Sequence, residues 1–103
     1  MKGIATLIRV DGTIIDTTLT EKVTLEHLKL AVGGHIEHVP MFDLYMNEHC
    51  IAFCNEEGKL LNLPFNMVAT TLWRAQRVPH PIDDVLNGDV IIIRGDNELM
   101  EAL

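Results

Sequence analysis

The sequence predicts an α+β fold in which a small mixed β-sheet carries two helices on one face. Two β-rich runs separated by a turn dipeptide open the chain, two later segments repeat apolar residues at helical spacing, and an almost wholly apolar run lies near the C-terminus. A chain of 103 residues has the size of one domain, and no linker or repeat divides it. We therefore expect residues 1–103 to form a single α+β domain.

The N-terminal segment is predicted to form a β-hairpin over residues 2–18. Its β-rich runs, residues 3–10 and 13–18, flank Asp11-Gly12. Asp-Gly between two such runs favours a two-residue hairpin turn, because Gly accepts positive φ and Asp tolerates it.

A short helix is predicted over residues 24–32. Thr24 can cap its N-terminus, and Leu28 and Val32 recur on one face. Gly33, the first of two consecutive glycines, offers the left-handed residue at which helices commonly end.

The rest of the predicted sheet comes from the middle and the end of the chain. Residues 35–40 and 42–46 alternate polar and apolar side chains, whereas residues 50–54 are continuously apolar, as in a strand buried on both faces. Residues 89–95 contain three consecutive isoleucines, which favour a central place in the sheet. Between them, residues 81–88 begin with Pro and end with Gly, which predicts one helical turn.

Two chemical alternatives arise in the middle strands. His35 and Glu37 would share a strand face, and both types are common zinc ligands, but a third ligand would have to come from His49 or Cys50 and no spacing requires it. A solvated polar strand face is the competing interpretation. Cys50 and Cys54 lie in an apolar run, and a catalytic cysteine needs an activating base and some exposure. We therefore assign no metal ligand, no cofactor and no catalytic residue.

A compact turn at residues 55–58 is predicted to lead into a second helix. Asn66 is placed to cap this helix, which carries Arg74 and Arg77 and must end before Pro79.

This stretch gathers positive charge in an otherwise acidic chain. Its three basic side chains could hold the phosphates of an anionic ligand, its aromatic side chains could stack on a base, and the helix N-terminus would add a positive dipole end. The competing interpretation is two solvated arginines and a lysine in a turn. The candidate ligand-binding residues are Lys59, Asn66, Arg74, Arg77, Trp73, Phe65 and Asn55.

Charge and hydropathy narrow the classes of partner. A formal net charge of −7 argues against a domain that neutralises many phosphates of a nucleic acid. No signal-peptide pattern is present, and no apolar run approaches the ~18–20 residues that span a bilayer. We expect a cytoplasmic protein with no membrane partner that folds alone or as a small homo-oligomer. The acidic tail, residues 96–103, would be a short helix, a frayed end or a subunit contact.

The order of hairpin, helix, strands, turn, helix and strand is similar in outline to the β-grasp arrangement of ubiquitin-like domains. The chain ends in Met100-Glu101-Ala102-Leu103 and lacks the terminal Gly-Gly that such modifiers and sulfur carriers use. Conjugation and sulfur transfer are therefore not expected.

Three ordered motifs carry a second resemblance: VGGHIE at residues 32–37, CNEEGKLLNLPFN at residues 54–66 and DVLNGDV at residues 84–90. Together they resemble a family of small proteins encoded by bacteriophages and bacterial mobile elements. The resemblance spans residues 24–95 and departs between 67 and 81, where a longer helix replaces a shorter link. It implies a phage or mobile-element accessory protein that is not an enzyme.

That context leads to three functional expectations. The first is a binding protein that sequesters a host nucleotide-derived immune signal, of the cyclic nucleotide or cyclic ADP-ribose type, in the host cytoplasm and at subunit interfaces. The alternative is an acidic protein–protein inhibitor of a host defence enzyme. A third is a hydrolase of such a signal, with Glu56, Glu57 or His35 as the general base.

Overall fold

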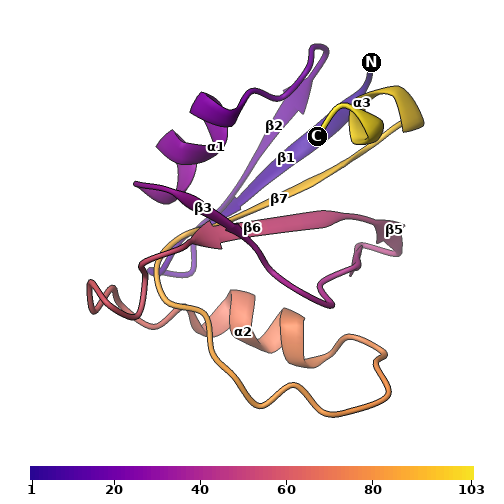
Figure 1. Ribbon diagram of the computed structural model, residues 1–103. Helices are drawn as coiled ribbons and strands as arrows, with labels where there is room; N and C mark the ends of the chain where they lie inside the picture. Colours follow the sequence, from indigo (N-terminus) through magenta and orange to yellow (C-terminus); the bar gives the residue numbers. More distant parts are fainter.

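The computed structural model describes residues 1–103 as one five-stranded sheet, a two-stranded hairpin and three helices (Figure 1). The sheet has the strand order β2-β1-β7-β6-β3, and β4 pairs with β5 outside it. The elements are β1 (Gly3–Ile8), β2 (Ile14–Leu19), α1 (Leu25–Val32), β3 (Ile36–His38), β4 (Leu44–Tyr45), β5 (Glu48–His49), β6 (Ile51–Asn55), α2 (Met67–Arg74), β7 (Val90–Gly95) and α3 (Asn97–Glu101).

The α+β class is confirmed, but the sheet is not mixed. Every pairing in it is antiparallel, including that of β7 with β1 on one side and with β6 on the other. The predicted central strand is β7, which enters the middle of the sheet from the C-terminal part of the chain. Its partners β1 and β6 both run opposite to it, so the sheet lacks the parallel pair that a mixed sheet requires.

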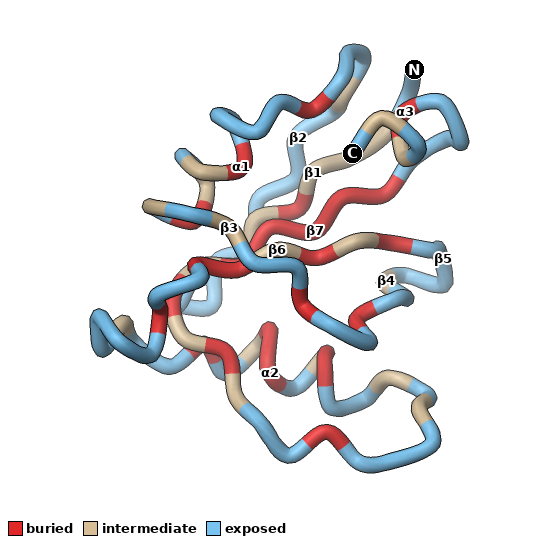
Figure 2. Tube along the Cα trace, viewed as in Figure 1, coloured by how far each residue is buried: buried red, intermediate tan, exposed pale blue.

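The two longer helices lie on opposite faces of the sheet, which corrects the prediction of one shared face (Figure 1). Successive side chains of a strand point to opposite faces. Accordingly, Val90 and Ile92 pack with α2 residues such as Trp73, whereas Ile91 and Ile93 belong to the cluster built with α1. Because β7 is apolar at both sets of positions, it can serve two cores, and Figure 2 shows it buried along nearly its whole length.

The predicted N-terminal hairpin is confirmed, with a different turn. Arg9 N–H donates to the carbonyl of Thr13 at 2.9 Å, and Gly12 N–H donates to the carbonyl of Arg9 at 2.9 Å. The loop therefore has three residues, 10–12, rather than two. Gly12 adopts a φ of 89° at the last loop position, as predicted, whereas Asp11 does not take a positive φ and instead accepts a hydrogen bond from Thr13 N–H through its Oδ1.

Both predicted helix starts are confirmed. The Thr24 side chain accepts from His27 N–H at the start of α1, which ends at Gly33 with a φ of 78°, and Asn66 caps α2. The helical turn predicted over residues 81–88 is wrong. That segment is irregular, because Asn87 forms an isolated antiparallel bridge with Phe65 instead of continuing a helix.

Candidate ligand-binding site

The predicted basic patch is largely occupied by contacts within the chain. Lys59 Nζ donates to Asp84 Oδ1 at 2.7 Å, and Arg74 donates to the main-chain carbonyls of Asp83 and Asp84. The hydrogen bond from Lys59 holds the pKa of the Asp84 carboxyl below its ordinary value, with a smaller contribution from Val85 N–H. Lys59 and Arg74 therefore converge, but on an acidic segment of the same chain.

Arg77 does not join them. It lies beyond the end of α2 and lines a separate surface hollow with Leu44, Met46 and Leu72. The preceding Gln76 bridges this region, since its side chain accepts from Leu44 N–H at 3.0 Å and donates to the Leu44 carbonyl at 2.9 Å. The three basic residues thus belong to two different surfaces, because α2 ends at Arg74 and the chain then turns away.

Asn66 is a structural residue rather than a ligand contact. Its side chain is fully buried, and its amide donates to the carbonyls of Ile8 at 2.9 Å and Gly88 at 3.0 Å. Its Oδ1 accepts from Ala69 N–H at 3.0 Å as the cap of α2. These three bonds join α2 to β1 and to the start of β7, and they leave no donor for a ligand.

Asn55 and Trp73 are likewise committed to the fold. The buried Asn55 donates to the Val32 carbonyl and accepts from Glu57 N–H, so it ties the turn after β6 to the end of α1. Trp73 is a buried core residue whose Nε1–H donates to the Pro40 carbonyl at 2.7 Å. Among the predicted aromatic contacts, only Phe65 is exposed.

The cavities beside Lys59 are small and acidic. Two of them, of about 90 and 140 Å³, share Glu37, Cys54 and Leu86 as walls. Glu56 lines the first cavity and Asp84 the second. Sites for drug-sized molecules usually measure roughly 300–1,000 Å³, so this region can hold at most a fragment of a nucleotide.

The two thiols and the metal alternative lack the surroundings that their chemistry requires. Burial raises the pKa of Cys50 and of Cys54 to about 11, so both remain protonated near neutral pH. Cys50 Sγ–H points to the Phe42 carbonyl at 3.6 Å rather than to a base. No group of three or more His, Cys, Asp or Glu side chains lies close enough together to bind a metal ion.

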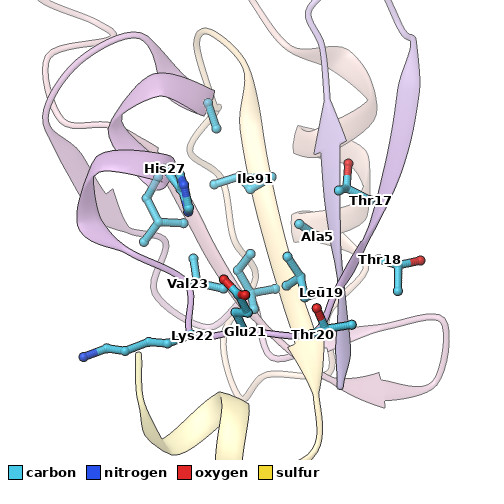
Figure 3. A pocket seen from close by; sticks show the side chains of 13 residues that line it. Ala5, Thr17, Thr18, Leu19, Thr20, Glu21, Lys22, Val23, His27 and Ile91 are labelled. Atoms are coloured by element: carbon cyan, nitrogen blue, oxygen red, sulfur yellow. The ribbon is translucent and has the colours of Figure 1, made fainter. Parts of the chain in front are cut away.

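A larger hollow lies on the opposite face of the sheet, and we call it the β2–α1 groove (Figure 3). Its volume is about 390 Å³. It exists because α1 packs over β3, β6 and β7 and leaves the edge strand β2 and part of its neighbour β1 less covered on that face. Its lining residues are Ala5, Thr17, Thr18, Leu19, Thr20, Glu21, Lys22, Val23, His27, Leu28, Ala31, Ile91 and Ile93.

The groove combines an apolar floor with a polar rim. Ile91 and Ile93 of β7 contribute to the floor, and Thr17, Glu21 and His27 supply hydroxyl, carboxylate and imidazole groups. Figure 3 shows Lys22 extending away from the other lining side chains, so its charge lies outside the hollow. Such a site suits a flat or compact apolar group with a few hydrogen-bonding atoms.

The sequence prediction missed this groove because none of its polar residues forms a recognised motif. The available indication was the run of threonines that follows Asp16. If a helix covered this strand, apolar residues would continue to alternate with polar ones there, as in a half-buried strand. Thr17 and Thr20 line the groove, and both are exposed.

A second missed feature is the buried Arg94 of β7. Its Nη1 donates to Glu48 Oε1 at 2.9 Å, and its guanidinium carbon lies 5.3 Å from the ring centre of Tyr45. Nε of Arg94 has no hydrogen-bond partner. These contacts dock the β4–β5 hairpin on the sheet.

No helix of the chain has both the length and the apolar character needed to cross a bilayer.

Comparison with known proteins gives a family and no functional relative. No curated protein and no solved structure matches the chain. A family model described as a domain of unknown function, DUF3846, matches residues 1–102. The chain therefore belongs to the DUF3846 family.

Proposed function

We propose that this protein binds a small amphipathic molecule in the β2–α1 groove and performs no chemistry on it. The observation that carries the proposal is the groove itself, a hollow of about 390 Å³ with an apolar floor and hydrogen-bonding groups at its rim. Its size falls within the range of small-molecule sites, whereas the cavities beside Lys59 fall below it.

The ligand class that we favour is a nucleoside-derived signal of the cyclic nucleotide or cyclic ADP-ribose type. A base could lie on the aliphatic floor near Ile91, with its polar edge bonded to Thr17, Glu21 or His27. The carboxylate of Glu21 disfavours a phosphate inside the hollow, so a phosphate would lie outside it, toward Lys22. Under this proposal the protein is a phage or mobile-element accessory protein that withholds the signal from host immunity.

Isothermal titration against a panel of nucleosides, cyclic mononucleotides, cyclic dinucleotides and cyclic ADP-ribose tests the proposal. Binding by at least one member should weaken at least tenfold in Ala31→Leu, which fills the groove with a good helix former. The control variant Arg74→Ala should bind like the wild type, because Arg74 lies in the basic patch on the α2 face and not in the β2–α1 groove. Loss of binding in Arg74→Ala alone would restore the basic patch as the site, and no heat across the panel would remove the proposal.

Recovery of the ligand after long incubation separates binding from hydrolysis. Chromatography of the denatured mixture should return intact ligand in stoichiometric amount. A product that accumulates beyond one equivalent would instead identify an enzyme.

A second candidate is a protein–protein inhibitor, favoured by an apolar exposed loop before α2. Leu60 is 83% exposed, and Leu61, Phe65 and Met67 also project large apolar side chains into solvent. The loop is ordered by Leu61 N–H donating to the Glu57 carbonyl at 2.8 Å. A contiguous patch of exposed apolar side chains often marks a protein interface, and these four residues lie close together in sequence.

Capture of a host protein on immobilised protein tests this second candidate. A specific partner should bind the wild type and be lost from the double variant Leu60→Ser, Leu61→Ser, while the groove variant Ala31→Leu still retains it. Equal capture by all three proteins would contradict the loop as the interface.

A further inference from the structure

Strand β2 forms one edge of the sheet, and its outer side is unpaired. The ladder with β1 begins where Arg9 bonds Thr13, so the odd-numbered residues of β2 direct their N–H and C=O groups toward β1. Ile14, Asp16 and Thr18 consequently direct theirs outward. A six-residue strand with free main-chain donors and acceptors is a template for a further strand.

This edge has a single charge, Asp16, and otherwise lacks the devices that usually block pairing. It contains no Pro and no Lys, its side chains are almost all exposed, and it includes Ile14 at 48% and Ile15 at 42% exposure. The opposite edge, β3, has only three residues, two of them exposed and polar, and Pro40 follows it closely. Charged, short or proline-flanked edges resist association, and long apolar ones favour it.

We propose that two copies of this chain pair antiparallel through β2, with Thr17 facing Thr17 of the second copy on a two-fold axis. In this register Ile15 lies opposite Leu19 of the second copy on the α1 face. On the α2 face Asp16 lies opposite Thr18, whose hydroxyl can donate to the carboxylate. These three kinds of facing pair are compatible, and the two five-stranded sheets become one.

The two neighbouring registers are less favourable. An axis at Asp16 would place two carboxylates directly opposite each other, and like charges in that position are destabilising. An axis at Thr18 would place the exposed Ile15 opposite Glu21 of the second copy. The axis at Thr17 avoids both, so self-complementarity selects a second copy rather than an arbitrary strand.

The pairing also brings two grooves together. A two-fold axis perpendicular to the sheet keeps both α1 helices on one face. Thr17 and Leu19 line the β2–α1 groove, so the grooves of the two copies meet across the new strand pair. The dimer does not depend on the proposed ligand, because it rests on the edge of the sheet alone.

Disulfide trapping tests the register. Facing residues of a non-hydrogen-bonded antiparallel pair have Cα atoms about 4.5 Å apart, which lies within the range for a disulfide. Thr17→Cys should therefore crosslink to a dimer under mild oxidation. The matched variant Asp16→Cys should stay largely uncrosslinked, since its counterpart is displaced along the strand. Crosslinking by Asp16→Cys but not by Thr17→Cys would overturn the register.

Sedimentation equilibrium tests the interface itself. Thr18→Pro removes an outward N–H and no β1 bond, so the dimer dissociation constant should rise at least tenfold while the thermal transition persists. Thr18→Lys places a cation opposite Asp16 of the second copy and should tighten the dimer several-fold. A wild-type monomer at high micromolar concentration, or a dimer insensitive to both changes, would overturn the proposal whatever the groove binds.

Discussion

The two faces of the sheet are built differently. The α2 face contains a cluster of 12 buried residues, covered by α2 and by the loops on either side of it, whereas the α1 face contains a cluster of six. On the α1 face a single eight-residue helix and the short α3 cover β3, β6 and β7, and the edge strand β2 remains open. The first face supplies most of the core, and the incomplete cover of the second leaves room for a ligand.

The largest expected effect comes from truncating one apolar residue on each of the two faces. Phe42→Ala removes a fully buried ring from the α2 face and should lower the free energy of unfolding by about 3–5 kcal/mol. Leu19→Ala, at the partly buried groove, should cost no more than about 1.5 kcal/mol. Chemical denaturation measures both. Equal losses would remove the asymmetry between the faces.

The two helix caps give the next contrast. Asn66→Ala loses the α2 cap and the buried hydrogen bonds to the carbonyls of Ile8 and Gly88, so it should cost about 2–4 kcal/mol. Thr24→Ala loses only an exposed bond to His27 N–H at the start of α1, which should cost about 1 kcal/mol. A Thr24 variant as damaging as the Asn66 variant would contradict the structural role assigned to Asn66.

Thiol labelling offers a third comparison. Because burial raises the pKa of Cys50 and Cys54 to about 11, neither should react with a disulfide reagent at pH 8 until the protein unfolds. A cysteine introduced at the groove by Glu21→Cys should react at least about 100-fold faster, since an ordinary exposed thiol is partly ionised at that pH. Rapid labelling of the wild type would contradict the closed core of the α2 face.

The smallest effect is expected at the rim of the α2 face. The hydrogen bond from Lys59 lowers the pKa of Asp84 from its ordinary value of 3.8. The ionised carboxylate therefore stabilises the fold fully above pH 3.8, and this stabilisation is lost as the pH falls through the lowered pKa. Both side chains are more than half exposed, and Asp84→Asn should therefore cost less than about 1 kcal/mol at pH 7. The difference should shrink progressively in denaturation curves recorded as the pH falls below 3.8.

Local sequence patterns were sufficient for most elements. Thr24 and Gly33 delimit α1, Asn66 starts α2, and the isoleucines of residues 90–95 form the central strand, because caps and apolar runs act on neighbouring residues. The segment at residues 81–88 failed as a helix, since its Asn87 bonds the distant Leu63 carbonyl and pairs with Phe65.

The candidate site was less predictable for the same physical reason. Proximity in sequence suggested that Lys59, Arg74 and Arg77 act together, but α2 ends before Arg77, and Asp84 neutralises Lys59 across a separation of 25 residues. Whether a basic side chain is free for a ligand depends on partners that only the folded chain supplies.

The sequence by itself determined the class of fold, the central strand and both helix caps, because these depend on local conformation and on the period of apolar residues. Only the tertiary structure decided that the helices cover opposite faces, that Asn66 and Trp73 are buried, and that an open groove lies over β1 and β2. Burial and cover arise from contacts between segments far apart in the chain, and an amphipathic pattern specifies a buried face without specifying what lies against it.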